Sequence, residues 1–559
     1  LYKLTALWGG QAGSLLFWAW LASIFIAIEV YRMRKHGKLY NSYMLIMGLF
    51  NATFILFLCT FVTNPFEVNP YGLFPPDGNG MNPMLQNPGM IIHPPLLYIG
   101  FVAYVIPFAH AFASSATHDT SAYWVKTSRS WSLFAWVLLT AGIVLGAWWA
   151  YVELGWGGYW AWDPVENASL FPWITGTALL HAAVIYERKL RLKSWAYLLA
   201  LITFELTIFG TYLTRSGIMT DSVHSFGKSA LGIFFLLFIF ISAAIFLVSM
   251  FNNRETLKDP ADFNFISREG IFFLSILCFV ALTLALIFYT MLPVLSEMLL
   301  SDKISVQQSS YNLVSTPFFI AIFLLAGLAP MMSFGQMQAG KLMKTYLPIF
   351  ICALAVTIFA IVTGHKRLAS LILTLTAATA LFSFLLLSVR MVKNGGVKVF
   401  IKNRRMAGVV IVHIGLAITA FGVIFSGNYN RELAMTVAPG TSFTFEEYTL
   451  NVDTVRHSEE ANYYSNYVPI QVMRGDSELT KMYPEIREYA NRPDQVFGEV
   501  AYNSMLKGDL YVILNGYDLS KNMIQLTAIF QPLLSWIWVG SIIMCIGGLL
   551  GMTHRAKES

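Results

Sequence analysis

The sequence contains little charge and little cysteine. Only 12% of its 559 residues are charged, whereas soluble proteins carry about 25%. The four cysteines lie far apart, inside or beside apolar runs, and none belongs to a CxxC or CxxCH motif. They are predicted to be buried free thiols. The chain therefore lacks a dithiol redox pair and any CxxCH attachment motif of its own.

Motifs for nucleotide binding and for nucleophilic catalysis are also absent from the sequence. It contains no P-loop, no Rossmann glycine pattern, no catalytic triad and no metal-hydrolase motif. The net charge of +6 is therefore interpreted as a matter of membrane topology, and no nucleic-acid partner is expected. The chain starts at Leu1 without a signal-peptide pattern, which predicts a further N-terminal part beyond the numbered residues.

Long apolar runs dominate the chain instead. Hydrophobic residues make up 56% of it, and runs of roughly 20 such residues cross a bilayer as helices. The predicted fold class is an all-α polytopic membrane protein embedded in lipid, with about 13 transmembrane helices and a small β-rich extracytoplasmic domain. The predicted helices lie near residues 13–31, 42–63, 91–114, 129–149, 171–187, 195–213, 229–251, 271–292, 313–336, 346–363, 368–391, 408–426 and 526–551.

Lysine and arginine predict the orientation of these helices. Basic residues gather in the connections at 31–38, 187–193 and 390–405, whereas 64–90 and 150–170 contain neither Lys nor Arg. By the positive-inside rule the basic connections are cytoplasmic. The loop at 150–170 then faces outward, and the C-terminal tail faces the cytoplasm.

One outward insert differs from the rest of the chain. Its segments TSFTFEEYTLNVDTV and YVPIQVM alternate in the manner of strands, with turn signals such as APG and RGD between them. The predicted organisation is a helical bundle over 1–426, a β-rich domain over 427–525, and a final helix with its tail over 526–559.

Two histidines are predicted to lie at one depth inside the membrane. His181 precedes Arg188 by seven residues and His413 follows Arg405 by eight, which places both imidazoles about 10–12 Å from the cytoplasmic charges. Polar side chains in lipid are usually functional or paired. Both imidazoles could ligate one haem iron, or each could make an unrelated interhelical hydrogen bond.

A second pair of histidines lies on the outward side. His93 opens a helix in GMIIHPPLLYIG, and His224 lies in the outward loop SVHSF. Each is interpreted as either an interfacial side chain or part of a ligand surface. His110 is predicted to be an ordinary interfacial histidine, and Glu205 an intramembrane carboxyl that is protonated or hydrogen-bonded.

The outward loop at 150–170 (the tryptophan loop) contains WGGYWAWDPVENAS. Its acids begin the next helix, because Asp163 suits the N-cap, Pro164 the first position and Glu166 the third. A membrane anchor is the ordinary interpretation of its indoles. A flat ligand such as a porphyrin would also fit, because indoles stack and glycines permit close approach. The predicted platform residues are Trp156, Gly157, Gly158, Trp160, Trp162 and Asp163.

The same segments carry a resemblance. WGGYWAWDPVENAS resembles the tryptophan-rich WWD signature of haem-handling membrane proteins, and the wider pattern is similar to the CcmF family. The matching segments are NPGMIIHPPLLY, TAGIVLGAWWAYVELGWGGYWAWDPVENAS, TALLH, GTYLTRSG, SVHSF and VHIGLAITAFG, in that order over most of the chain.

The resemblance implies a haem lyase of cytochrome c maturation, in the bacterial inner membrane with a periplasmic active face. Such a protein takes haem from a CcmE-type chaperone and attaches it to apocytochrome c with a CcmH-type subunit. His93 and His224 match the family's outward ligands of substrate haem. His181 and His413 match its ligands of a resident b-type haem, with quinol as electron source.

Some assignments stay open at the level of the sequence. In the outward TRSG turn, Arg215 is a candidate partner of a haem propionate, because guanidinium binds carboxylate bidentately, or an interfacial anchor. No catalytic nucleophile is expected, since the partner's cysteines would supply the thiols. The alternatives are a haem transporter or delivery protein, a lyase of the nitrite-reductase branch, and an ion-coupled transporter that uses Glu205.

Overall fold

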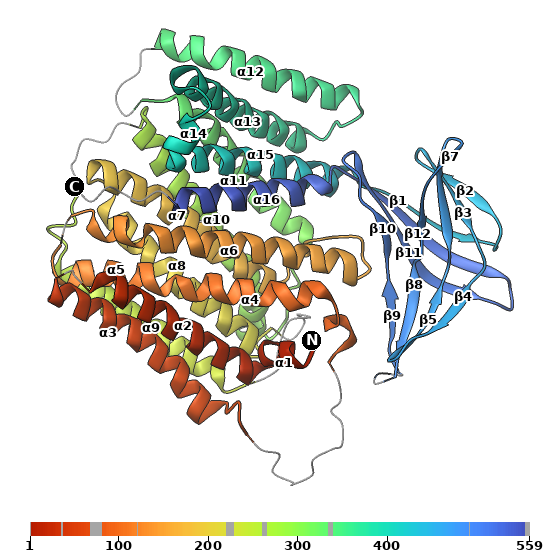
Figure 1. Cartoon of the computed structure of the whole chain (residues 1–559), viewed down its shortest axis with the longest axis horizontal. Helices are drawn as coiled ribbons and strands as arrows, with labels where there is room; N and C mark the ends of the chain where they lie inside the picture. Colours follow the sequence, from red (N-terminus) through yellow and green to blue (C-terminus); the bar gives the residue numbers. More distant parts are fainter. Residues whose placement is uncertain are drawn as a thin grey trace.

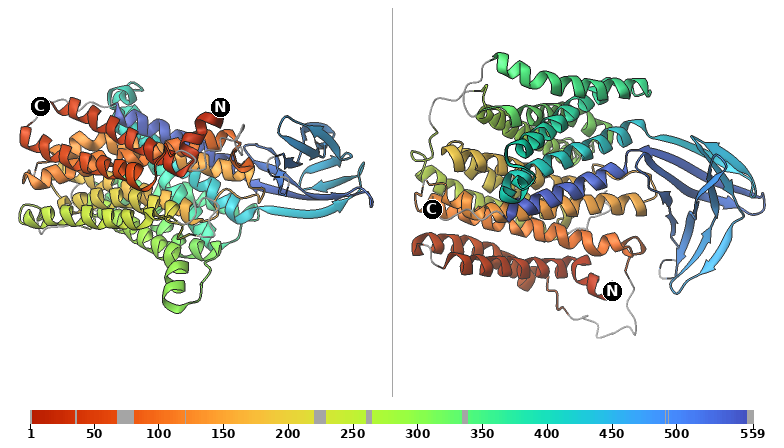
Figure 2. Two further views of the ribbon diagram at one scale, coloured as in Figure 1. Left: turned by 90° about the horizontal axis from the view of Figure 1, so that it is seen from below. Right: turned by 45° about the horizontal axis from the view of Figure 1, so that its top comes forward.

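The chain folds into a helical bundle with a β-sandwich beyond one of its ends (Figure 1). This arrangement is seen in a computed structural model. Both further views in Figure 2 show the sandwich beyond the same end of the bundle. The structure describes residues 2–34, 37–67, 81–119, 121–219, 229–259, 265–333, 339–490, 492 and 494–553.

Thirteen helical segments among the described residues are long and apolar enough to cross a membrane, as predicted. Helices α4 and α5 together form one of these spans, and the short helices α1 and α14 form none. The helices are α1 Tyr2–Gly9, α2 Gln11–Met33, α3 Lys38–Phe57, α4 Pro88–Ala103, α5 Val105–Ala116, α6 Tyr123–Glu153, α7 Pro164–Lys189, α8 Lys193–Arg215, α9 Leu231–Asn252, α10 Arg268–Leu300, α11 Gln308–Leu328, α12 Ala339–Val362, α13 Leu368–Gly395, α14 Val399–Lys402, α15 Arg404–Tyr429 and α16 Ser535–Met552.

Glycines bring α4 and α6 into close contact. A Cβ on Gly142 would lie 2.7 Å from Leu97 Cδ2, and one on Gly100 would lie 2.8 Å from Leu139 Cγ. Small residues let helix backbones approach in a membrane, where packing replaces the hydrophobic effect. The segment GIVLG at 142–146 of α6 therefore serves as a flat surface for α4.

Helices α15 and α16 pack through a second glycine seam. A Cβ on Gly415 would lie 2.6 Å from the Gly540 oxygen, and one on Gly540 would lie 2.6 Å from the Gly415 oxygen. One heptad further along, Gly408 and Gly547 meet in the same way. The two helices are antiparallel neighbours, although the whole sandwich is inserted between them in the sequence.

The described residues of the sandwich form twelve strands in three antiparallel sheets, ordered β1-β12-β11-β10, β2-β3-β6-β7 and β4-β5-β8-β9. Its core includes Leu450, Val472, Val512 and Leu526, which come from the first two sheets. The strands are β1 Arg431–Val437, β2 Ser442–Phe445, β3 Tyr448–Val452, β4 Arg456–Glu459, β5 Tyr463–Tyr467, β6 Ile470–Arg474, β7 Ser477–Met482, β8 Glu485–Tyr489, β9 Val496–Glu499, β10 Ala501–Asn503, β11 Gly508–Asp518 and β12 Met523–Pro532.

The predicted boundary between sandwich and last helix was wrong. The sequence placed the helix from residue 526, but β12 continues to Pro532 and α16 begins at Ser535. Nearly every residue of β12 after Gln525 is buried. A strand that is buried on both faces forms one apolar run with the helix after it, so hydropathy cannot separate the two.

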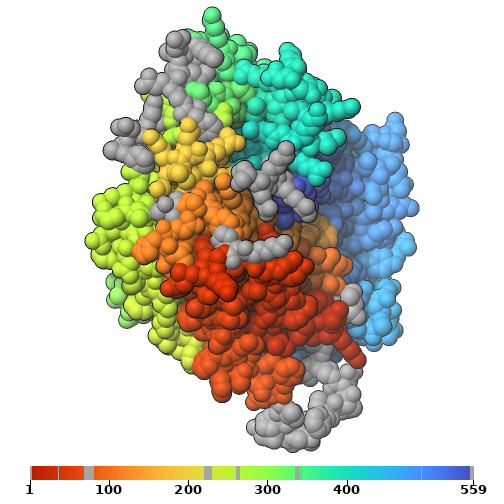
Figure 3. All heavy atoms as spheres, turned by 60° about the vertical axis from the view of Figure 1, so that its left-hand side comes forward, coloured from red at the N-terminus to blue at the C-terminus, as the bar shows by residue number. Residues whose placement is uncertain are grey.

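The two ends of the bundle differ in charge. The basic connections, from α2 to α3, from α7 to α8 and from α13 to α15, lie at the end away from the sandwich (Figure 1). Figure 3 shows this end, with the N-terminal helices in red and the sandwich in blue behind them. The tryptophan loop and the start of α4 lie at the opposite end, beside the sandwich.

Candidate functional site: two histidine positions and the tryptophan loop

His181 of α7 and His413 of α15 face each other between their helices. Their ring centroids are 6.3 Å apart and the ring planes are 80° apart. Each Nδ1 lies 2.8 Å from a backbone oxygen four residues earlier, Thr177 for His181 and Val409 for His413. Because a carbonyl can only accept, each Nδ1 carries a hydrogen, and in the neutral imidazole each Nε2 then keeps its lone pair.

The spacing of the two rings fits two imidazole ligands of one iron. An imidazole nitrogen binds a first-row metal at about 2.0–2.1 Å. The ring centre lies roughly 1 Å behind that nitrogen, so two rings on one metal are about 6 Å apart. The observed spacing of 6.3 Å agrees with this value. The surroundings are apolar, with Phe272 near His181 and Phe384 stacked on His413 at 4.3 Å.

An ion pair joins the same two helices nearer the basic end. Arg405 of α15 donates from both terminal nitrogens to the Glu187 carboxylate of α7, at 2.9 and 2.5 Å. Bidentate pairs of this kind fix geometry as well as supplying attraction. The pair therefore holds α7 and α15 in register beside the two histidines.

His93 lies flat on α6. Its Nδ1 is 2.6 Å from the Gly142 oxygen, and a Cβ on Gly146 would lie 2.5 Å from its Cε1. The imidazole is therefore positioned by the α6 backbone. Its predicted partner His224 lies outside the described residues, so that pairing stays a prediction.

The indoles of the tryptophan loop contact one another and α11. Trp162 stacks on Tyr311 with centroids 5.3 Å apart and planes 6° apart, and its Nε1 donates to Asn312 Oδ1 at 2.9 Å. Trp160 meets Trp162 edge-on at 6.0 Å, and Trp156 is 38% exposed. Sequence reasoning missed Tyr311 and Asn312, because nothing in the start of α11 marks them as neighbours of this loop.

The sandwich and α15 hold the other side of the loop. Gly157, at φ +73°, accepts a hydrogen bond from Gln531, and a Cβ on it would lie 2.5 Å from Ile529 Cδ1. The Tyr159 hydroxyl pairs with Ser426 Oγ at 3.1 Å, and burial raises the pKa of Tyr159 to about 12. The loop is therefore fixed in shape, while its role as a haem platform stays a prediction.

The acids of the loop have the structural role that the sequence predicted. Asp163 is the N-cap of α7, with its Oδ1 accepting from the Val165 N–H at 2.8 Å. Glu166 reaches back to accept from the Asp163 N–H at 3.0 Å, which completes a capping box. Glu166 also accepts from the Ala161 N–H at 3.0 Å.

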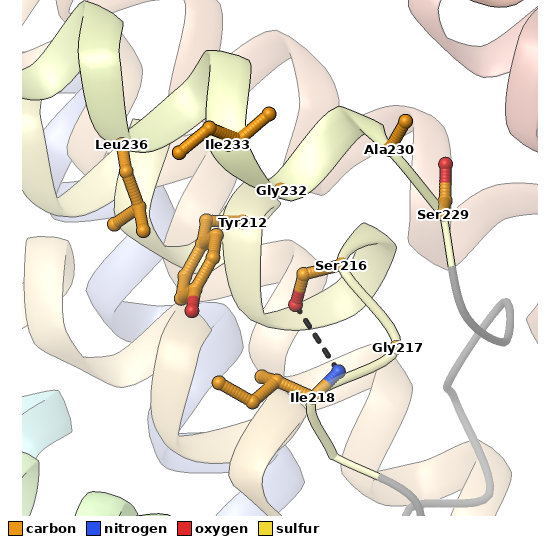
Figure 4. Close-up of a pocket in the computed structure, with 9 residues that line it drawn as sticks. All are labelled: Tyr212, Ser216, Gly217, Ile218, Ser229, Ala230, Gly232, Ile233 and Leu236. Atoms are coloured by element: carbon orange, nitrogen blue, oxygen red, sulfur yellow. Dashed lines mark hydrogen bonds between the residues drawn. The ribbon is translucent and has the colours of Figure 1, made fainter.

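Arg215 is buried inside the bundle and does not lie on its surface. It is 2% exposed and donates to Ser14 Oγ at 2.7 Å and to the Tyr98 hydroxyl at 3.3 Å. It therefore ties α8 to α2 and α4, and its contact with a propionate stays a prediction. Beside it, the end of α8 and the start of α9 line an open cavity of about 620 Å³ that includes Tyr212 and Leu236 (Figure 4).

Two predictions about isolated polar residues had different outcomes. His110 was expected at the interface but is fully buried, 2.9 Å from both Glu29 Oε1 and the Tyr40 hydroxyl. A buried polar group is tolerated when it is hydrogen-bonded, and here the partner is the Glu29 carboxylate. Because Glu29 lies on another helix, the sequence of α5 alone does not reveal this partner. Glu205 is hydrogen-bonded, as one of its two alternatives required, by Ser242 Oγ at 2.7 Å.

Cys352 is exposed, contrary to the expectation of buried thiols.

Comparison with known proteins gives the class and then the family. Residues 8–220 match the model of the cytochrome c assembly proteins, and residues 428–532 match the CcmF C-terminal β-sandwich. This chain is thus a polytopic membrane protein of cytochrome c biogenesis.

Individual relatives narrow the class to a family. The chain is 33% identical to the cytochrome c-type biogenesis protein CcmF of Escherichia coli, over 98% of this chain and 84% of that protein. It is 32% identical to the biogenesis protein NrfE of Haemophilus influenzae, over 99% and 86%. A solved structure of the cytochrome c haem lyase CcmF superposes with a TM-score of 0.82 at 25% identity, over 99% of this chain and 85% of that one. The chain belongs to the CcmF family.

Proposed function

We propose that this chain is the haem lyase of cytochrome c maturation. It receives haem from a CcmE-type chaperone, reduces the haem iron, and promotes thioether attachment to the CxxCH motif of an apocytochrome c presented by a CcmH-type subunit. The observation that carries the proposal is the facing pair His181 and His413, whose spacing fits two axial ligands of one iron.

The proposal has two haem positions. His181 and His413 would hold a resident b-type haem, which would supply one-electron chemistry when bound. Phe272 and Phe384 would exclude water from it. Quinol is the proposed source of its electrons.

Substrate haem occupies the second position. His93 and His224 would be its axial ligands, and the indoles of the tryptophan loop would support its plane. Each thioether forms when a cysteine thiol of the apocytochrome adds across a haem vinyl group, with sulfur bonding to one carbon and the proton going to the other. The chain supplies no nucleophile, and its contribution is binding and orientation.

The charge at the two ends of the bundle supports the sidedness. The end away from the sandwich holds the basic connections at 31–38, 187–193 and 390–405, which the positive-inside rule assigns to the cytoplasm. The sandwich and the tryptophan loop then lie in the periplasm, on the outer face of a bacterial inner membrane.

A redox difference spectrum of the purified protein tests the resident haem. We expect a low-spin haem signal in the wild type, its loss in His181→Ala and His413→Ala, and its retention in His93→Ala, in which cytochrome c maturation falls. His457→Ala is a matched control, because this imidazole lies on the exposed edge strand β4. A wild-type protein without a low-spin signal would refute the resident haem.

The product of the reaction separates this proposal from its alternatives. With the CcmH-type subunit and an apocytochrome present, a lyase yields haem that stays attached after acid–acetone extraction, whereas a delivery protein yields extractable haem. The NrfE relative, at 32% identity, makes the nitrite-reductase branch the second candidate. Supplying an apocytochrome with CxxCH and one with an altered haem motif decides between the branches.

A further inference from the structure

Two tryptophans form a reciprocal pair between α6 and α7. The rings of Trp136 on α6 and Trp173 on α7 are stacked, with centroids 5.7 Å apart and planes 21° apart. Trp136 Nε1 donates to Thr177 Oγ1 of α7 at 2.8 Å, and Trp173 Nε1 donates to Thr140 Oγ1 of α6 at 2.8 Å. Each indole is thus bound to the other's helix, and the pair is held at a fixed separation.

The pair connects the two histidine positions. On one side, the carbonyl of Thr177 accepts from His181 Nδ1 at 2.8 Å. On the other side, Thr140 is two residues from Gly142, whose carbonyl accepts from His93 Nδ1 at 2.6 Å. A continuous path of hydrogen bonds and short covalent segments therefore runs from one imidazole to the other through both indoles.

The pair also lies between the two positions in depth. Trp173 precedes His181 by eight residues of α7, about 12 Å along the helix. Gly142 follows Trp136 by six residues of α6, about 9 Å in the outward direction. The indoles also pack in one cluster with Val412 and Leu416, the neighbours of His413 along α15.

We propose that the Trp136–Trp173 pair is the electron-tunnelling bridge between the iron bound by His181 and His413 and the iron of substrate haem at His93. The inference rests on the proposed function. One electron crosses the pair, so that a ferrous iron becomes ferric on the inner side and a ferric iron becomes ferrous on the outer side. No bond forms or breaks, and the indoles are not oxidised.

The physical reason is the steep fall of tunnelling rate with distance. His181 lies eight residues inward of Trp173, and Gly142 lies two residues outward of Thr140, to which Trp173 donates, so the two histidine positions are about 15 Å apart in depth. This is a long single step through saturated groups. Delocalised π systems and hydrogen bonds lower the tunnelling barrier relative to the same length of packed aliphatic side chains. Two stacked indoles with a hydrogen bond at each edge provide both features at the centre of the gap.

Electron transfer can be measured directly in the purified protein that carries its resident haem. The resident haem is reduced with dithionite supplied at one electron per haem, ferric haem is added as the substrate, and stopped-flow absorbance follows reoxidation of the resident haem. We expect the double variant Trp136→Leu/Trp173→Leu to transfer at least tenfold more slowly than wild type. Its resident-haem content, spectrum and midpoint potential should stay unchanged.

Further variants separate a bridge from a purely structural contact. Trp136→Phe and Trp173→Phe keep an aromatic ring without its N–H donor, and they should give intermediate rates even if the Leu variant does not fold. Trp195→Leu is the matched control. This half-buried indole packs against Phe273, with ring centroids 5.7 Å apart, and takes no part in the α6–α7 contact.

The outcomes distinguish the inference from the proposal beneath it. A double variant, or Phe variants, that transfer electrons within twofold of the wild-type rate would overturn the bridge. Slow transfer that is matched by an equal loss of resident haem, or by a shifted spectrum, would also overturn it, because the pair would then act only in packing. A wild type that binds no resident haem would instead overturn the proposed function.

Discussion

Gly146 offers a way to displace His93 without changing any atom of the histidine. A Cβ at this position would lie 2.5 Å from His93 Cε1 and 2.7 Å from its Nδ1. Carbon atoms in contact are normally about 3.5–4.0 Å apart. The imidazole of a Gly146→Ala variant must therefore retreat by about 1 Å.

The imidazole cannot move away from the new methyl group without losing a hydrogen bond. The Nδ1–Gly142 hydrogen bond of 2.6 Å is anchored on the same helix as the new methyl group, so moving the ring away stretches it beyond hydrogen-bonding range. Enlarging a residue in a packed core costs about 1–3 kcal/mol. If the imidazole turns away to relieve that strain, the population of molecules with His93 in its haem-binding position falls by roughly 5- to 150-fold.

The assay is covalent haem in c-type cytochromes of cells that carry the variant as their sole copy. We expect Gly146→Ala to lower it strongly while the resident-haem spectrum of the purified protein stays intact, because His181 and His413 lie elsewhere. Gly427→Ala is the control, since its Cβ would be 3.9 Å from the nearest atom, the Tyr159 hydroxyl oxygen. Wild-type maturation by a folded Gly146→Ala protein would refute the reasoning that α6 positions His93.

Two further predictions concern stability. Asp163→Ala removes the side-chain half of the capping box and should lower the free energy of unfolding by about 0.5–2 kcal/mol, seen as a lower Tm in detergent, while Asp163→Ser should recover most of it. Burial, assisted by the Glu485 carboxylate and opposed by Arg487, raises the pKa of Glu499 above 4.5. A folded-state pKa above the unfolded value means that the folded state binds more protons. The stability that protonated Glu499 contributes is therefore full at low pH and is lost as pH rises from 4.5 through the raised pKa. The Tm of the full protein should therefore fall less steeply between pH 4.5 and 8 in Glu499→Gln than in wild type, and an unchanged slope would contradict the assignment.

The sequence predicted those features that depend on local pattern. The capping box follows from the residue types at 163, 164 and 166, and such boxes form from short-range contacts alone. The common depth of His181 and His413 follows from counting residues to the nearest basic side chain. The thirteen spans follow from the length of apolar runs.

Features that depend on contacts between distant segments were not predictable from one sequence. The Trp136–Thr177 bond joins residues 41 positions apart, and the burial of His110 depends on a carboxylate 81 positions away. Neither residue has a neighbour in sequence that marks its partner. The stacking of Trp162 on Tyr311 was hidden for the same reason, because α11 reaches the tryptophan loop only through the packing of the bundle.

The attachment of the sandwich has a mechanical consequence. Only Asn430 separates α15 from β1, and only two residues separate β12 from α16. The strands β1 and β12 pair with each other, and the two helices meet along their glycines. The sandwich and the helices α15 and α16 therefore move together as one rigid unit. A protein that pushes on the sandwich would turn α15 as well, and with it the helix face that carries His413.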